Sequence, residues 1–228
     1  MSGHDLTHHL MGIVSDATLR QFVYEHMGEY CHQCRNRLNS LKLCIYLAKR
    51  QVPPASATDL GVLEDRYAVL ERSIDLIQTL CRPMSLSLAS LGLDLLIQDR
   101  MPRWIARAID LDVDFVCAPP TERAVALFDP DRLGQALDLL WDWRMRRMEP
   151  GSTVQFGWRV EYGIASVNWH EHPNGFASSP PPAAETDAWA LPLITRVIEA
   201  HGGKATLSES DAWRLDLAWP IQATPSPA

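Results

Sequence analysis

The sequence has no long apolar run and no excess of positive charge, and its number of cysteines is odd. No stretch approaches the roughly 18–20 apolar residues that a membrane-spanning helix needs. The first ten residues carry histidines and an aspartate where a signal peptide has a basic region and then an apolar run, so we expect no signal peptide. Lys and Arg number 21 against 28 Asp and Glu, and this net charge of −7 argues against nonspecific nucleic-acid binding. Five cysteines, an odd and scattered set, are expected to be free thiols.

The remaining composition is that of a folded protein. The chain has 228 residues, of which 46% are hydrophobic, and this length allows one or two domains with a real core. We therefore expect a soluble, acidic, cytoplasmic protein with no membrane and no nucleic acid among its partners.

Two long amphipathic segments open the chain. In residues 16–50 apolar side chains recur every three or four positions, the spacing of one helical face, with Asp16 as a plausible N-cap. This helix must end by Val52, because Pro53 and Pro54 disfavour helical geometry. In residues 60–81 the apolar positions alternate steps of three and four, which is typical of a coiled-coil seam.

Two such helices joined by a short turn predict an antiparallel hairpin. A lone hairpin cannot bury both apolar stripes, and the rest of the chain supplies no matching pair of helices. The sequence therefore predicts a homodimeric four-helix bundle.

After Pro83 the pattern changes to helices interleaved with short strands. Helices are expected at 91–107, 131–148 and 189–201, and strands at 111–116, 153–158, 164–169, 204–207 and 213–219. A segment rich in Pro, Ser and Ala at 172–187 is expected to be a loop. This order predicts a two-layer α/β sandwich, and thus an α+β fold for the whole chain. The predicted parts are a flexible tail (1–15), the hairpin (16–82), the sandwich (83–221) and a frayed tail (222–228).

This order of parts resembles the core of two-component histidine kinases, over nearly the whole chain from about Leu19 to Pro220. Residues 32–38, His-Gln-Cys-Arg-Asn-Arg-Leu, resemble the phosphoacceptor box of the family, in which Asn or Thr follows the His by four residues. Residues 128–137 are similar to the segment leading into the ATP-binding helix. Residues 193–203 resemble the last helix and its Gly-Gly turn.

The nucleotide boxes depart from the family. Asp142 stands where the family has a magnesium-holding Asn, and bulky Trp143 follows it. Residues 171–175, Glu-His-Pro-Asn-Gly, keep one of the two glycines of the adenine-binding box. Residues 190–193, Ala-Leu-Pro-Leu, replace a Gly-x-Gly phosphate cradle, and proline has no N–H to offer. Because three boxes fail together, we expect ATP binding to be lost.

A histidine-kinase fold that keeps its phosphoacceptor and loses its nucleotide site resembles the dimeric histidine phosphotransferases of bacterial phosphorelays. The resemblance implies a phosphotransfer protein, rather than an autokinase, that shuttles a phosphoryl group between receiver-domain aspartates through His32. It also implies no cofactor of its own, because the receiver domain of the response regulator brings the Mg²⁺. The implied partners are receiver domains, a second copy of the chain and a hybrid histidine kinase.

The residues themselves agree with this chemistry. His32 falls opposite the apolar stripe of its helix and is expected to face solvent. A histidine is ordinarily largely neutral at pH 7, which leaves a nitrogen lone pair to attack phosphorus. Arg35 would offset phosphate charge, and Asn36, one turn along, would position a water or the phosphoryl group. Gln33 replaces the acidic residue that in kinases helps activate the His.

Three alternatives stay open on the sequence alone. The first is an active but divergent kinase, with Asp142 and Glu171 as Mg²⁺ ligands. The second is a noncatalytic scaffold that binds a kinase or a receiver. The third, a metal or redox role for Cys31 and Cys34, is disfavoured because there is no second pair and Cys34 falls in the apolar stripe.

Overall fold

The computed structural model describes residues 3–51, 57–118, 125–173, 187–209 and 212–221. The chain divides into two compact units, residues 8–83 and residues 84–228 together with 1–7. Across the described ranges, no helix is long and apolar enough to cross a membrane.

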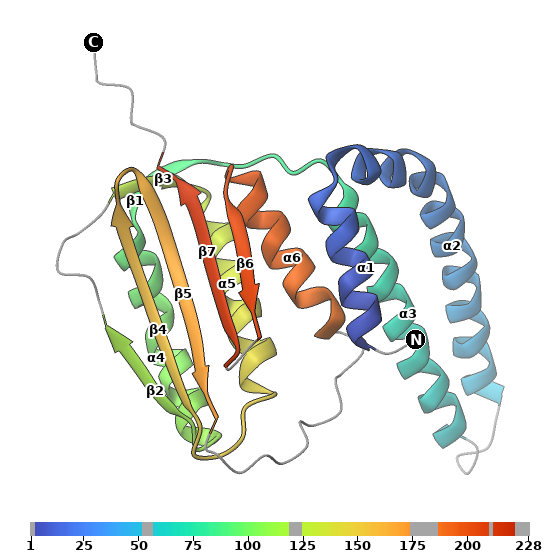
Figure 1. Cartoon of the computed structure of the whole chain (residues 1–228). Coiled ribbons are helices and arrows are strands. Elements are labelled where there is room, and N and C mark those ends of the chain that lie inside the picture. The colour runs from blue at the N-terminus through green and yellow to red at the C-terminus, as the bar shows by residue number, and fades with distance from the viewer. Residues whose placement is uncertain (1–2, 52–56, 119–124, 174–186, 210–211, 222–228) are drawn as a thin grey trace. The chain divides into compact units, whose positions relative to one another are not determined.

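The first unit contains a helical hairpin. Helices α2 (Ala17–Gln51) and α3 (Ala57–Cys81) run antiparallel and pack side by side (Figure 1). The Asp16 carboxylate accepts hydrogen bonds from the backbone N–H groups of Thr18 and Leu19, both at 2.9 Å, so the predicted N-cap is confirmed. Helix α2 ends at Gln51, before the two prolines, which lie outside the described residues.

The apolar stripe of the hairpin is only partly buried within one chain. Cys31, Ile45 and Tyr67 are buried between the helices. Other apolar side chains of the two helices are largely exposed, namely Leu19, Phe22, Tyr30, Leu41, Leu63 and Leu70. A single hairpin therefore leaves an apolar surface without a partner, and the predicted four-helix bundle stays a prediction.

The start of the chain differs from the prediction. Residues 1–15 were expected to be a flexible tail, but the structure has helix α1 over Gly3–Ser15. Leu10 and Val14, four residues apart and thus on one helical face, are both buried. Histidines and two glycines interrupt the apolar residues of this segment. The Arg20 guanidinium donates to the carbonyl of Val14 and so satisfies the end of α1.

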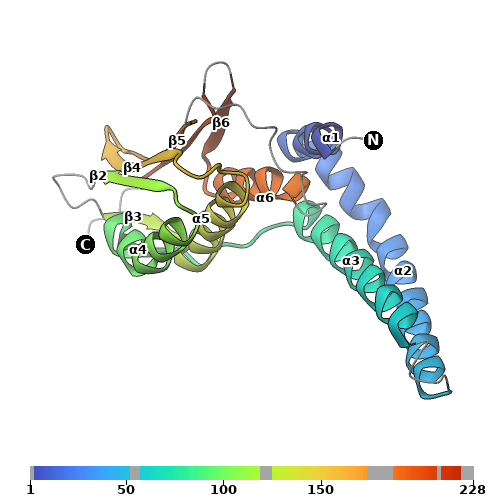
Figure 2. The same cartoon turned by 90° about the horizontal axis from the view of Figure 1, so that it is seen from below.

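The second unit is built on a five-stranded sheet. Its strand order is β2 (Asp114–Ala118), β4 (Thr153–Glu161), β5 (Ile164–His172), β7 (Arg214–Pro220) and β6 (Lys204–Ser208). The β2–β4 pair is parallel and the other pairs are antiparallel. Helices α4 (Leu93–Asp110), α5 (Pro130–Met145) and α6 (Asp187–Ala200) lie on one side of this sheet (Figure 2). The predicted α+β fold is confirmed.

Aromatic side chains fill the layer between the sheet and the helices. The rings of Trp104 on α4 and Trp141 on α5 stack with centroids 5.1 Å apart. From the strands, Phe156 packs edge-on against Trp104, and Trp169 packs edge-on against Trp141. Burial alternates along β4 and β5, so every second residue of these strands packs into this core.

Several details depart from the prediction. The strand expected at 111–116 begins at Asp114, because Asp112 takes a left-handed turn with φ 54°. The helix expected at 91–107 is α4, which begins two residues later than predicted because β1 occupies Ala89–Gly92. Strands β1 (Ala89–Gly92) and β3 (Val125–Phe128) form a separate antiparallel pair that was not predicted. Most of the predicted loop, residues 174–186, and the predicted frayed tail, 222–228, lie outside the described residues.

Candidate functional site

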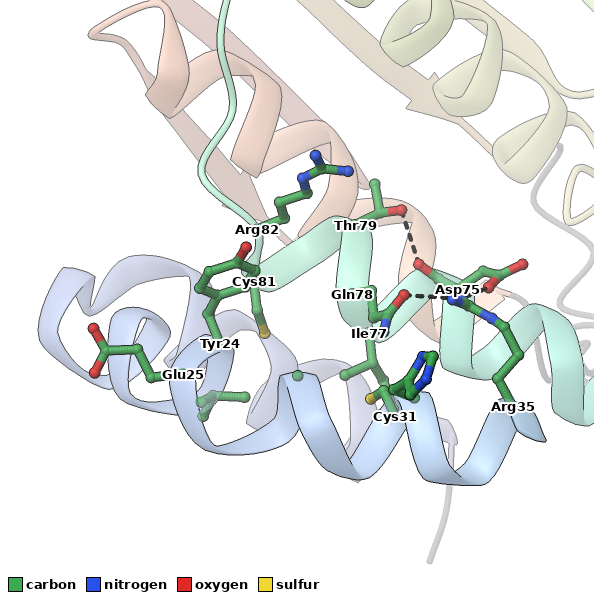
Figure 3. Close-up of a pocket in the computed structure, with 13 residues that line it drawn as sticks. Tyr24, Glu25, Cys31, Arg35, Asp75, Ile77, Gln78, Thr79, Cys81 and Arg82 are labelled. Atoms are coloured by element: carbon green, nitrogen blue, oxygen red, sulfur yellow. Dashed lines mark hydrogen bonds and ion pairs between the residues drawn. The ribbon is translucent and has the colours of Figure 1, made fainter. Parts of the chain in front are cut away.

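The phosphoacceptor candidate lies beside an open pocket of the hairpin. His32 is exposed on α2, as its position opposite the apolar stripe predicted. It lines a pocket of about 600 Å³ between α2 and the C-terminal half of α3. Figure 3 shows the side chains around this pocket; its polar and charged members are Tyr24, Glu25, His32, Arg35, Asp75, Gln78, Thr79 and Arg82.

Arg35 joins the two helices across the pocket. Its Nη2 donates to Oδ1 of Asp75 at 2.5 Å and to Oε1 of Gln78 at 2.8 Å (Figure 3). Both partners come from α3, and Thr79 one turn after Asp75 donates its hydroxyl to the Asp75 carbonyl at 2.8 Å. The guanidinium of Arg35 is thereby fixed one helical turn from His32.

The third predicted site residue lies elsewhere. Asn36 is exposed, and it is not among the residues that line the pocket. Its backbone carbonyl accepts the hydroxyl of Ser40 at 3.1 Å. The structure therefore brings His32 and Arg35 together and leaves Asn36 outside their pocket. The contributions of Asp75 and Gln78 were missed, because nothing in the sequence fixes which turn of α3 faces His32.

The cysteine next to His32 is a buried neutral thiol. Cys31 is 2% exposed and lies in the floor of the pocket. Burial, with a smaller contribution from neighbouring Cys34, raises the pKa of the Cys31 thiol. A raised pKa disfavours the thiolate that redox chemistry and metal binding use. Cys31 is buried and Cys34 is half-buried.

In the second unit, the carboxylate at the predicted adenine-binding box is already engaged. Glu171 near the end of β5 is buried, and its carboxylate accepts hydrogen bonds from Nε and Nη2 of Arg144, each at 2.6 Å. Trp169 donates its indole N–H to the same carboxylate at 2.7 Å. The Arg144 guanidinium also lies 3.8 Å from the ring centre of Trp213.

The other two nucleotide boxes also differ from what a phosphate site needs. Asp142 is exposed on α5, and Trp143 beside it is buried. Ala190 and Leu191 are buried inside α6, which begins at Asp187 and continues through Pro192. This segment is therefore packed helix, not an open glycine loop. Asn174 and Gly175 of the adenine-binding box lie outside the described residues.

No family model and no curated protein matches this sequence. Solved structures do match in fold. Histidine kinase AdeS of Acinetobacter baumannii aligns with a TM-score of 0.56 and 13% identity over 83% of this chain and 98% of that chain. A histidine kinase of Burkholderia phymatum aligns with a TM-score of 0.52 and 16% identity over 93% of this chain and 98% of that chain.

A third similar structure is histidine kinase ThkA in complex with response regulator protein TrrA. It aligns with a TM-score of 0.58 and 15% identity over 92% of this chain and 66% of that chain. The chain therefore has the fold of a histidine-kinase dimerisation and phosphotransfer hairpin followed by an ATP-binding domain.

Proposed function

We propose that the protein is a histidine phosphotransferase of a two-component phosphorelay. His32 takes a phosphoryl group from the aspartyl phosphate of one receiver domain and gives it to the aspartate of another. In the first step an imidazole nitrogen forms a P–N bond, the acyl P–O bond breaks, and its electron pair leaves with the receiver carboxylate. ATP takes no part in the cycle.

The environment of His32 supports this chemistry. Phosphoryl transfer asks a protein mainly for in-line positioning and stabilisation of charge. His32 is exposed at the edge of a pocket, so a partner aspartyl phosphate has access to it. Arg35 lines the same pocket and supplies a fixed positive charge for the phosphoryl oxygens.

The ion pair between Arg144 and Glu171 is the observation that carries the choice of a phosphotransferase over a kinase. Glu171 occupies the position from which the family carboxylate contacts adenine. Here both carboxylate oxygens are held by Arg144 inside the protein. Freeing them for a nucleotide would leave a buried, uncompensated arginine, which costs several kcal/mol.

Receiver domains and a second copy of the chain are the proposed partners. A histidine kinase with the same fold was crystallised in complex with a response regulator, which supports a receiver domain as the partner here. The receiver domain is also the proposed source of the Mg²⁺ for the transfer. The apolar surface left exposed on α2 and α3 supports a homodimer.

The test is a transfer assay with radiolabelled receiver-domain phosphate. Acid-labile label should move onto the wild-type protein, and His32→Gln should abolish this transfer. His26→Gln is the matched control, because His26 is also exposed on α2 and should leave transfer unchanged. Failure to label the wild-type protein from a panel of phosphorylated receivers would overturn the proposal.

A divergent histidine kinase is the second candidate, favoured by one observation. Asp142 is exposed on α5 and offers carboxylate oxygens at the position of the magnesium-binding Asn of the family. Incubation with labelled ATP and Mg²⁺, without any receiver, separates the two candidates. Label on His32 would identify a kinase, whereas the phosphotransferase stays unlabelled.

A further inference from the structure

A cation that shares the pocket with His32 is already paired with an anion. Arg35 and Asp75 form an ion pair of 2.5 Å whose side chains are 39% and 56% exposed, respectively. Both bonds from Arg35 to α3 use the same nitrogen, Nη2. Within the described part of the chain, the N–H groups of its Nε and Nη1 therefore remain available to donate hydrogen bonds to a ligand.

We propose that Asp75 competes with the phosphoryl group on His32 for the charge of Arg35, and so sets the phosphoryl-transfer equilibrium between His32 and its receivers. This inference rests on the proposed function. Asp75 acts through Arg35 and is a positioning residue, and Gln78 is the neutral partner that keeps the guanidinium in place.

Helix geometry brings the three groups within reach of one another. His32 and Arg35 are three residues apart on α2, which places their Cβ atoms about 5–6 Å apart on the same side of the helix. The pocket that both residues line also contains Asp75. A phosphoryl group on His32 carries close to two negative charges and would share this pocket with the Asp75 carboxylate.

The competition has a use in a relay. A phosphotransferase must give its phosphoryl group away as readily as it takes it. An unopposed arginine beside His32 would stabilise phosphohistidine and make the protein a sink for phosphate. A carboxylate that shares the charge of this arginine weakens the stabilisation, and the partial exposure of both side chains keeps this effect small.

The test measures the equilibrium ratio of phosphohistidine to receiver phosphate in charge variants. Asp75→Asn keeps the shape and the acceptor oxygen but removes the charge, and should raise this ratio about two- to fivefold, the range expected for an exposed ion pair. Arg35→Gln should lower the ratio. In the Arg35→Gln background, Asp75→Asn should have almost no effect, because the two residues act through each other.

A matched control lies on the same two helices. Lys49 and Glu64 form an ion pair of 2.6 Å with 43% and 45% exposure, outside the residues that line the pocket. Glu64→Gln should leave the ratio unchanged. A change of the same size in Glu64→Gln, or no change in Asp75→Asn while the wild-type protein transfers normally, would overturn the inference.

A receiver-free measurement separates this inference from the proposed function. Phosphoramidate, a small phosphoryl donor, can load histidine without a protein partner, and the extent of His32 loading is measured in the same variants. The inference would be sustained if Asp75→Asn raised the loading of His32 and this rise disappeared in the Arg35→Gln background. If no receiver exchanged phosphate with the protein in the same experiments, the relay function would be rejected. No loading of His32 by either donor would reject both.

Discussion

Arg144 on α5 and Glu171 on β5 form a two-pronged ion pair inside the α/β unit, with Nε to Oε1 and Nη2 to Oε2 both at 2.6 Å. Their side chains are only 10% and 8% exposed. The pair joins the C-terminal end of a helix to the end of a central strand. It also holds both oxygens of a carboxylate in the segment that resembles the adenine-binding box of histidine kinases.

Breaking this pair should destabilise the protein strongly. Glu171→Gln leaves the Arg144 charge buried without its counter-charge, so the free energy of unfolding should fall by about 3–5 kcal/mol. Urea denaturation measures the change. Glu161→Gln is the control, because its pair with Arg159 is 60% and 54% exposed and its loss should cost about 1 kcal/mol or less. Equal losses in the two variants would contradict the interpretation of the buried pair.

Asp129 should make stability depend on acid pH. Burial alone would raise the pKa of this carboxyl. Backbone N–H groups donate to it, that of Arg132 at 2.9 Å and that of Ser87 at 2.7 Å. Together with Asp131 and His201 they outweigh burial and lower the pKa of Asp129 below its ordinary value. The unfolded chain then binds the proton more tightly than the folded protein does.

The resulting stabilisation is complete above about pH 4, the ordinary range of an aspartate, and is lost as the pH falls through the lower folded pKa. At pH 7, Asp129→Asn should cost about 1–2 kcal/mol, because Asp129 also caps α5. This gap from wild type should narrow between pH 4 and pH 2, as measured by urea denaturation. The exposed Asp99, changed to Asn, should alter stability by less than about 0.5 kcal/mol at each pH. A gap that is constant with pH would contradict the prediction.

Gly203 should not tolerate a side chain. A Cβ at this position would lie 2.2 Å from the backbone oxygen of Ala218 and 2.6 Å from Cβ of Trp219. Gly203→Ala must therefore move backbone, and we expect a loss of about 2–3 kcal/mol and a clear drop in Tm. A Cβ at Gly157 meets nothing within 4 Å, so Gly157→Ala should leave Tm unchanged or raise it. Similar Tm values for the two variants would contradict the close approach at Gly203.

A charge on the exposed hairpin surface should separate the proposed dimer. Leu70 on α3 is 54% exposed in the single chain. Light scattering should give twice the chain mass of 25.6 kDa for the wild type and one chain mass for Leu70→Glu. Ile109 on α4 is 73% exposed, and Ile109→Glu should remain a dimer. A wild-type monomer at micromolar concentration would contradict the proposed assembly.

The helices and the alternating strands were predictable because their information is local. The three- and four-residue spacing of α2 and α3 and the alternation of β4 and β5 appear directly in the sequence. Helix α1 was missed, although Leu10, Ile13 and Val14 have helical spacing, because histidines and two glycines interrupt its short apolar face. The β1–β3 pair was missed, because each strand has only four residues and the two lie far apart in the chain.

The site was predictable to the same extent. His32 and Arg35 are three residues apart on one helix, so periodicity places them on the same side of it. Asn36 is also on this helix, but one residue further turns it about 100° away from the Arg35 side, and it falls outside the pocket. Asp75 and Gln78 lie some forty residues away, and only the packing of α3 on α2 decides which of its turns meets Arg35.

The order of residues alone thus determined a helical hairpin, a following α/β layer and an exposed histidine, because each follows from spacing within a single element. Tertiary structure alone decided which charges meet. Asp75 opposes Arg35, and Arg144 holds Glu171, because helix packing and strand register bring together groups that the chain separates. Electrostatic attraction depends on distance in space, which no local pattern of residues encodes.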